Sequence, residues 1–299
     1  MVGHTFLGRY RAVRLIGEGG MGQVFFARQL SPPREVVVKV MHERIAAAPR
    51  FRQTFEQEMT LMARLRHPHI VEQLDAGVDP LRGPFLVLEY LPGTSLEQLR
   101  RRQRRFAPGR VGRWVVQFCS ALHTAHAAGV VHRDLKPENL MVLDPDTADE
   151  RIKVMDFGLA QLSAVPHIAL EKLTGTCGHI GGGTPDFLPP EQVRGDGVDH
   201  RGDFYSVGVM LFQLLTGRLP FTGPGVADVL LARVEKAPPR FADVFPGHDI
   251  PPGVEAVIRQ CLAKYPNERP QCARELAEAF EQALGERLIR PSDFAGVAE

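Results

Sequence analysis

The run from His132 to Asn139 concentrates side chains that could catalyse a transfer reaction; it reads His-Arg-Asp-Leu-Lys-Pro-Glu-Asn. Asp134 could accept a proton from an attacking hydroxyl, Lys136 could neutralise charge on a transferred phosphoryl group, and Asn139 offers an oxygen to Mg²⁺. Seventeen residues after Asn139, Asp156 begins an Asp-Phe-Gly sequence. It would be the main Mg²⁺ ligand, because Mg²⁺ favours hard oxygens and keeps phosphate oxygens in its shell. Either segment alone could be a charged loop. The two segments together, with His132–Asn139 before Asp156-Phe-Gly, are not expected by chance.

A glycine-rich motif lies near the start of the chain, with Gly17, Gly19, Gly20 and Gly22 followed by Val24. The pattern G-x-G-x-x-G lets backbone N–H groups approach phosphates, and it occurs in dinucleotide-binding folds and in kinase nucleotide loops. A dinucleotide-binding turn opens a helix, whereas the residues that follow here are β-branched and aromatic, so this loop joins two strands. The Gly-Lys-Ser/Thr ending of a Walker-type loop is missing. On this motif alone, a glycine-rich hairpin without a ligand would be an equal alternative.

Lys39 ends the apolar run Val-Val-Val-Lys, where an ammonium group is costly unless it is paired. The alternative is a lysine on an edge strand that reaches water. A carboxylate partner is available on the helix predicted for residues 50–66, because Glu58 lies three residues after Phe55 and four before Met62, on the apolar face. We therefore predict that Lys39 and Glu58 both point inward and pair.

Two regions of different texture must position these groups. Up to about Tyr90, short alternating or β-branched runs predict strands, and after Pro92 the periodicity is helical. The predicted strands are 10–16, 23–30, 35–40, 70–74, 84–90 and 151–155, and the predicted helices are 50–66, 109–128, 201–216, 254–264 and 271–284. The stretch 162–185 has no clear period, and loops of this length are usually functional or mobile. A small β-rich lobe and a larger helical lobe are therefore expected.

The composition excludes several classes of protein. The 299 residues hold 36 Lys and Arg against 35 Asp and Glu, a net charge of +1, which does not fit a dedicated nucleic-acid binder. No apolar run approaches the roughly 18 to 20 residues needed to cross a bilayer, so no membrane contact is expected within this chain. Four cysteines without a CxxC pair indicate reduced thiols in a cytosolic compartment.

Taken in order, these motifs resemble those of the protein kinase superfamily, and most closely the eukaryotic-like (Hanks-type) serine/threonine kinases of bacteria. The resemblance runs from about Tyr10 to Leu284. Beyond the groups above, it includes His67-Pro-His-Ile-Val71, Gly183-Thr-Pro185, Pro190-Glu191, Asp203-x-Tyr-Ser-x-Gly208 and Arg269. It implies an α+β bilobal fold, with an antiparallel-sheet N-lobe carrying one long helix over 1–91, a mainly helical C-lobe over 92–285, and a tail over 286–299.

The same resemblance implies ATP and Mg²⁺ as cofactors and transfer of the γ-phosphoryl group to a hydroxyl. Asp134 and Lys136 would be catalytic, Asn139 and Asp156 would hold the metal, and Leu88 would be the gatekeeper before the hinge that recognises adenine. The residues implied to bind ATP are Ile16, Gly17, Gly19, Gly20, Gly22, Val24, Val37, Lys39, Glu58, Glu89, Leu91 and Met141.

Specificity and regulation follow from the resemblance as well. Lys136 and Thr184 match the serine/threonine pattern. Arg133 would pair with a phosphate in the activation segment, for which Thr174 and Thr176 are the candidate sites. The alternative is that these threonines merely populate a flexible loop.

Other implied contacts are structural. Asp203 would anchor the catalytic-loop backbone, and Glu191 and Arg269 would form a buried ion pair. The sequence departs from the family pattern in three places: Val37 replaces a small alanine, Phe187 replaces a common tyrosine, and Leu188-Pro189-Pro190-Glu191 replaces the usual Ala-Pro-Glu. We therefore expect a tighter nucleotide pocket and a stiffer substrate-docking segment.

Protein substrates are expected as partners, with self-association for trans-autophosphorylation. The expected location is cytoplasmic, either as a free protein or as the cytosolic domain of a longer membrane-anchored one. Two alternatives stay open, a pseudokinase scaffold and a small-molecule kinase; the intact Lys39, Asp134 and Asp156 argue against the first, and the Gly183–Glu191 segment argues against the second. We interpret the arginine-rich run 100–105 as a solvated helix face and His123 and His126 as packing or surface residues.

Overall fold

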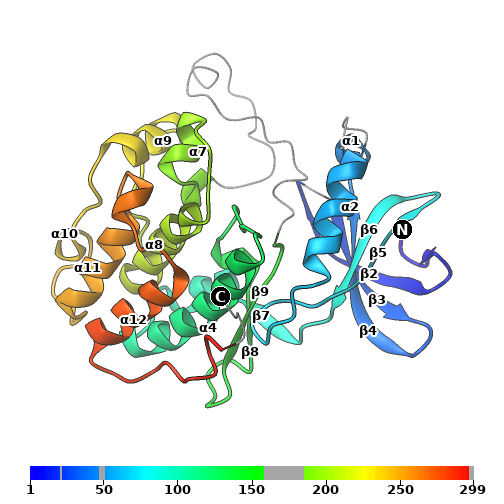
Figure 1. Cartoon of the computed structure of the whole chain (residues 1–299), viewed down its shortest axis with the longest axis horizontal. Helices are drawn as coiled ribbons and strands as arrows, with labels where there is room; N and C mark the ends of the chain where they lie inside the picture. Colours follow the sequence, from blue (N-terminus) through cyan, green and yellow to red (C-terminus); the bar gives the residue numbers. More distant parts are fainter. Residues whose placement is uncertain (21, 47–50, 158–184, 296–299) are drawn as a thin grey trace.

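A computed structural model describes residues 1–20, 22–46, 51–157 and 185–295 of the chain. An antiparallel sheet with a helix against it forms one lobe, and a bundle of helices forms the other (Figure 1). The expected α+β fold of two lobes is therefore confirmed.

The sheet of the first lobe has six strands in the order β1-β2-β3-β4-β6-β5, and neighbouring strands are antiparallel. Successive side chains of a strand point to opposite faces, so one face carries Phe25, Val36, Val38 and Val40, which pack into a core with Phe6 and Phe85. The strands are β1 Thr5–Phe6, β2 Tyr10–Gly19, β3 Gly22–Gln29, β4 Arg34–Met41, β5 Gln73–Asp79 and β6 Gly83–Glu89.

The helix α2 (Phe51–Met62) follows the short α1 (Glu43–Ala46) and lies against this sheet (Figure 1). Phe55 and Met59 bury their side chains against Met41 and Leu86 of the sheet. The helical spacing of its apolar residues is what turns this face inward.

The second lobe is mainly helical and carries a small sheet, β7-β8-β9, at its junction with the first. Helices α4 and α8 lie in its core, and α8 is buried along nearly its whole length. The strands are β7 Gly93–Ser95, β8 Leu140–Leu143 and β9 Arg151–Val154; the helices are α3 Leu96–Gln103, α4 Pro108–Ala127, α7 Pro190–Arg194, α8 Arg201–Thr216, α9 Val226–Glu235, α10 Phe241–Val244, α11 Pro252–Cys261 and α12 Ala273–Leu284.

One predicted strand is wrong in position. The sequence places it over 70–74, but β5 runs from Gln73 to Asp79, and Ile70 makes only an isolated bridge to Val154. Ile70 and Val71 are apolar because they pack into the junction between the lobes, at 1% and 3% exposure. Within the part of the chain that the structure describes, no helix is long and apolar enough to span a membrane.

Candidate active site

The catalytic segment His132–Asn139 is held from below by one carboxylate of α8. Asp203 is 1% exposed, and its two oxygens accept the backbone N–H of His132 at 2.9 Å and of Arg133 at 2.8 Å. Arg133 has φ = 64°, a left-handed conformation that is costly for a residue with a side chain and persists only when its surroundings enforce it. Asp203 supplies that enforcement, as the family resemblance implies.

The predicted catalytic residues lie together. Lys136 Nζ contacts both carboxylate oxygens of Asp134, at 3.0 and 2.7 Å. Asn139 Nδ2 donates to the backbone carbonyl of Asp134 at 2.7 Å and to its side chain at 3.2 Å. These contacts use the nitrogen of the Asn139 amide, so its oxygen is the atom left to face a cation.

The second predicted metal ligand, Asp156, lies beside this group. Its φ of 62° is again left-handed, and one carboxylate oxygen is 2.9 Å from Lys39 Nζ. Burial alone would raise the pKa of Asp156, but Lys39 and, more weakly, Lys136 lower it below its ordinary value. The Asp156 carboxylate is therefore ionised at neutral pH.

His132 connects the catalytic loop to the strand before Asp156. Its Nε2 is 2.8 Å from the Met155 carbonyl, and its Nδ1 is 3.3 Å from the Asp134 N–H. A carbonyl only accepts and an N–H only donates, so these partners assign the neutral tautomer with the proton on Nε2. The imidazole ring also lies 4.7 Å from the Phe157 ring, which fixes its orientation.

The predicted partner of Lys39 is wrong in this structure. Glu58 is on the buried face of α2, at 6% exposure, and Lys39 is buried at 7%, so both point inward as expected. Nevertheless, among the described residues Lys39 pairs with Asp156 and forms no ion pair with Glu58. Burial raises the pKa of Glu58, and the charge of Arg133 partly offsets this. Helical periodicity fixes the face of Glu58 but not how closely α2 approaches β4, and that distance decides which carboxylate reaches Lys39.

The glycine motif forms the turn between the antiparallel strands β2 and β3. It does not open a helix, as the turn of a dinucleotide-binding fold would. Gly22 is required by packing, because an added Cβ would lie 1.9 Å from the Val40 carbonyl oxygen. Gly19, in contrast, has nothing within 4 Å of such a Cβ, and Gly17 meets only Val24 at 3.8 Å. The fold alone therefore does not require glycine at 17 or 19, whereas close approach of a phosphate to the backbone would.

Strand register places the other predicted nucleotide residues on one face of the sheet. Val24 lies opposite Lys39, and Val37 lies opposite Leu88. Lys39 and Val37 are two residues apart and so share a face. Ile16, on β2, is 40% exposed, and Gly20 lies at the tip of the β2–β3 turn.

An apolar cluster at the lobe junction brings the remaining predicted nucleotide residues together. Leu91 is buried with Val71 and Leu143, and Leu88, Met141 and Met155 pack around them. Glu89 is held in place by Lys153, whose Nζ is 2.5 Å from its carboxylate. An apolar surface of this kind suits the face of a planar heterocycle.

The donor set fits a magnesium ion shared with a nucleotide. Asp156 and Asn139 offer two hard oxygens, and Mg²⁺ is usually bound by one or two protein oxygens together with substrate phosphates. No cluster of three or more His, Cys, Asp or Glu side chains that could hold a metal by itself exists within the described residues.

Thr174, Thr176 and Thr184 lie outside the described residues. Of the predicted regulatory group, Arg133 alone is placed: its backbone is bound to Asp203, and its guanidinium is near enough to lower the pKa of Glu58.

Sequence reasoning missed the contacts of two residues, one that supports the catalytic loop through Asp203 and one that holds the segment before α7. His126 of α4 lies with Nε2 2.8 Å from Asp203 Oδ2, so it is not a simple packing residue. Ser206 of α8 donates to the Phe187 carbonyl at 2.8 Å. Ser206 follows Asp203 by one helical turn on the same strongly buried helix, a spacing that could have indicated a shared inner face.

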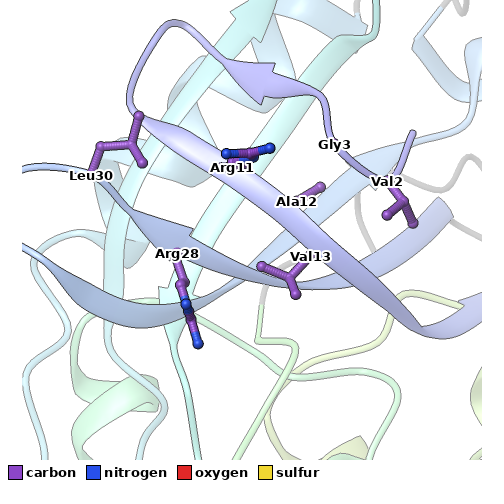
Figure 2. Close-up of a pocket in the computed structure, with 7 residues that line it drawn as sticks. All are labelled: Val2, Gly3, Arg11, Ala12, Val13, Arg28 and Leu30. Atoms are coloured by element: carbon purple, nitrogen blue, oxygen red, sulfur yellow. The ribbon is translucent and has the colours of Figure 1, made fainter.

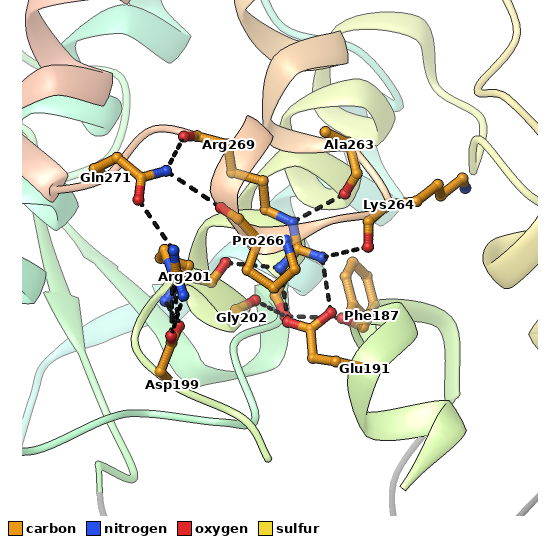
Figure 3. Close-up of polar contacts among 11 residues, drawn as sticks. Phe187, Glu191, Asp199, Arg201, Gly202, Ala263, Lys264, Pro266, Arg269 and Gln271 are labelled. Carbon is orange, nitrogen blue, oxygen red and sulfur yellow. Dashed lines mark hydrogen bonds and ion pairs between the residues drawn. The ribbon is translucent and has the colours of Figure 1, made fainter. Parts of the chain in front are cut away.

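The predicted ion pair between Glu191 and Arg269 is formed. Arg269 donates from both terminal nitrogens to the two oxygens of Glu191, each at 2.7 Å, and also to three backbone carbonyls (Figure 3). Both side chains are almost fully buried. This network fixes the start of α7, and with it the chain that precedes Pro190.

A cavity of about 430 Å³ lies elsewhere, on the outer side of β2 and β3 (Figure 2). Its lining contains none of the predicted site residues; it consists of Val2, Gly3, Arg11, Ala12, Val13, Arg28 and Leu30. We assign it no part in the chemistry.

Comparisons with known proteins agree with the geometry. The protein kinase domain family matches residues 10–281. Serine/threonine-protein kinase pkn3 of Myxococcus xanthus is 41% identical over 285 residues, covering 95% of this chain and 50% of the relative. Serine/threonine-protein kinase PknB of Mycobacterium tuberculosis is 37% identical over 282 residues, covering 90% and 42%. The crystal structure of the M. tuberculosis PknI kinase domain superimposes with a TM-score of 0.71 at 28% identity, covering 95% and 99%. The chain thus spans about half the length of the curated relatives.

Proposed function

The chain belongs to the protein kinase family, with relatives among the serine/threonine kinases of bacteria, and we propose that it transfers the γ-phosphoryl group of Mg·ATP to Ser and Thr hydroxyls of proteins. One observation carries the proposal. Lys136 and Asn139 both hydrogen-bond to Asp134. The ion pair of Lys39 with Asp156 lies near enough to this group for the charge of Lys136 to lower the pKa of Asp156.

In the proposed reaction, the acceptor hydroxyl attacks the γ-phosphorus while its proton moves toward the carboxylate of Asp134, and ADP leaves. Lys136 holds Asp134 in position and offsets charge on the transferred group. A bound Mg²⁺, held by Asp156 and the amide oxygen of Asn139, would neutralise the phosphates. Because the transition state is loose, positioning and charge neutralisation supply most of the catalysis.

The nucleotide is assigned to the face of the sheet that carries Lys39. The turn Gly17–Gly22 would cover the phosphates, and Lys39 would grip them. Val24, Val37, Leu91 and Met141 would enclose adenine, with the backbone of Glu89 and Leu91 for its polar edge. Glu58 would replace Asp156 as the partner of Lys39 if α2 moves closer to β4. That exchange would free Asp156 for the metal.

Regulation is proposed to follow phosphorylation of the activation segment. A phosphate on Thr174 or Thr176 would pair with Arg133, by charge-assisted hydrogen bonds. Self-association would let one copy phosphorylate another. A cytoplasmic location is proposed as well, supported by the free thiols of Cys119, Cys261 and Cys272.

The test uses the purified chain and its Asp134→Asn variant with Mg·ATP, followed by intact-mass and phosphosite analysis. We expect phosphate on Ser or Thr in the wild type, chiefly at Thr174 and Thr176, and none in the variant, while both bind ATP with similar affinity. ATP binding without phosphate on the chain or on generic proteins would instead support a pseudokinase scaffold or a small-molecule kinase. Phosphotyrosine as the main product would refute the Ser/Thr assignment.

A further inference from the structure

A buried arginine lies beneath the segment that precedes α7. Arg233 of α9 is 1% exposed, and its guanidinium donates to two backbone carbonyls, those of Asp186 at 2.5 Å and Leu188 at 3.0 Å. Between them, the Phe187 carbonyl accepts from Ser206 at 2.8 Å. Three consecutive carbonyls are thus each bound by a buried side chain from a helix of the second lobe.

These side chains supply the hydrogen-bond donors that backbone N–H groups would provide in a helix or a sheet. Residues 185–187 form a single 3₁₀ turn, and two prolines, Pro189 and Pro190, follow at the start of α7. Proline has no N–H to donate, so nearby carbonyls have few backbone partners. Buried carbonyls left without a donor are costly, and a planar guanidinium with a fixed fork of donors can satisfy two at once.

Burying the charge is itself unfavourable, which argues that the contact has a purpose beyond filling space. Burial lowers the pKa of Arg233, and Tyr205 and Asp186 offset this. An apolar side chain of similar size would occupy the same volume without that cost. What it could not do is bind the two carbonyls.

The helix that carries Arg233 is itself tied down. Lys264 Nζ donates to the Arg233 carbonyl at 2.6 Å and lies 4.2 Å from the centre of the Phe221 ring. The Lys264 carbonyl in turn accepts from Arg269, the partner of Glu191 (Figure 3). The guanidinium is therefore anchored to the same network that fixes the start of α7.

The segment before α7 and the catalytic loop are also held by the same helix, α8. Asp203 and Ser206 lie one turn apart on α8, and they bind the loop and the Phe187 carbonyl respectively. Arg233 adds a second anchor from a different helix. With α8 alone the segment could pivot about one carbonyl, whereas two helices fix both its position and its direction.

We propose that Arg233 is a positioning residue that holds Asp186–Leu188 as a rigid platform for the acceptor peptide, in register with Asp134. The proposal rests on the protein kinase function proposed above. It assigns to Arg233 an effect on binding of the protein acceptor and not on binding of ATP, since the two carbonyls that its guanidinium binds belong to the segment before α7.

The test compares wild type with Arg233→Met, which removes the donors, and Arg233→Lys, which keeps the charge but not the fork. Arg259→Met is the matched control, because Arg259 donates to the Pro238 carbonyl at 2.8 Å, in another part of the same lobe. Amide hydrogen exchange is measured over 185–195 and over the catalytic loop, and steady-state kinetics with myelin basic protein and ATP follow.

In Arg233→Met we expect at least tenfold faster exchange over 185–195, unchanged exchange in the catalytic loop, and a KM for the protein acceptor raised about tenfold or more. The KM for ATP and the basal ATP hydrolysis should stay within twofold. Arg233→Lys should be intermediate, and Arg259→Met should match the wild type in both readouts.

Unchanged exchange over 185–195 in both Arg233 variants would overturn the proposal, as would a loss of kcat and ATP affinity in parallel with acceptor affinity. If Arg233→Met does not fold, Arg233→Lys decides by the same criteria. A wild-type chain without phosphotransfer would contradict the proposed function, while the exchange data would still decide whether Arg233 holds the segment.

Discussion

At the scale of the residue, the clearest case of a buried charge with a fixed partner is the ion pair of Arg269 and Glu191. The Arg269 side chain is 0% and the Glu191 side chain 4% exposed. Such a pair is weak evidence for net stability, because desolvating two ions offsets their attraction. Breaking it is different, since one charge is then left buried alone.

We therefore expect Glu191→Gln to lower the free energy of unfolding by about 3–5 kcal/mol, because it strands the Arg269 guanidinium. Urea denaturation measures this directly. The exposed pair Arg151–Asp144, 3.1 Å apart, is the matched control, and Asp144→Asn should cause no measurable change. A loss below about 1 kcal/mol in Glu191→Gln would mean that water reaches the guanidinium.

Gly22 and Gly19 lie in the same turn, but we expect glycine to be needed for packing at position 22 and for ATP binding at position 19. Gly22→Ala places a methyl group 1.9 Å from the Val40 carbonyl oxygen, so we expect a loss of about 2 kcal/mol or more in stability. Gly19→Ala meets nothing within 4 Å. It should leave thermal unfolding unchanged and weaken ATP binding, as isothermal titration would show. Equal unfolding temperatures for the two variants would contradict the distinction.

At the scale of the element, the sequence predicts what depends on local pattern. The bounds of α8, 201–216, are predicted correctly because an apolar run ends at Gly217, which adopts φ = 75°. Helix α9 was not predicted, and α3 was anticipated only as a solvated helix face over 100–105. The partner of Lys39 was predicted wrongly for another reason: it depends on how α2 sits on the sheet, which is set by tertiary packing. Arg233 could not be recognised, since its partners are backbone atoms distant in sequence.

The connection between α2 and β5 contains a histidine that should make stability depend on pH. His67 Nδ1 accepts from the His69 N–H at 3.1 Å, so protonation there would break a hydrogen bond. Burial, with smaller contributions from His69 and Lys153, lowers the pKa of His67 to about 4. An unfolded chain takes up this proton near the ordinary pKa of 6.5. As the pH falls from 6.5 toward 4, the unfolded state is therefore protonated first, and stability is lost.

Because the His67 side chain is partly exposed, we expect the loss over this range to be about 1–2 kcal/mol. Urea midpoints at pH 7 and pH 4.5 for wild type and His67→Gln measure it. The variant should be less stable at pH 7 but should show a smaller change between the two pH values. Equal pH dependence in the two proteins would mean that His67 keeps an ordinary pKa when folded.

At the scale of the whole molecule, the two lobes and the C-terminal segment are joined by packing at the same place. Met62 and Ile70, from the first lobe's side, belong to the hydrophobic core of the second. Residues after α12 return to this junction: Phe294 is buried at 7% and stacks edge-on with the His123 ring. Ser120 links the segment to the first lobe, since its hydroxyl donates to the Asp293 carbonyl and lies 3.0 Å from His67 Nε2.

This docking predicts that the kinase fold extends past α12. Phe294→Ala removes a ring that packs against His123 and Arg274, and we expect a loss of about 3 kcal/mol or more in the free energy of unfolding. A chain shortened after Gly285 should lose at least as much. Arg287→Ala is the control, because Arg287 is exposed and its removal should change stability by less than about 0.5 kcal/mol. Since the segment contacts Ser120 and, through it, His67, the shortened chain should also show a smaller pH dependence between pH 7 and pH 4.5. A shortened chain as stable as the full one would mean that the segment lies on the lobe without contributing to it.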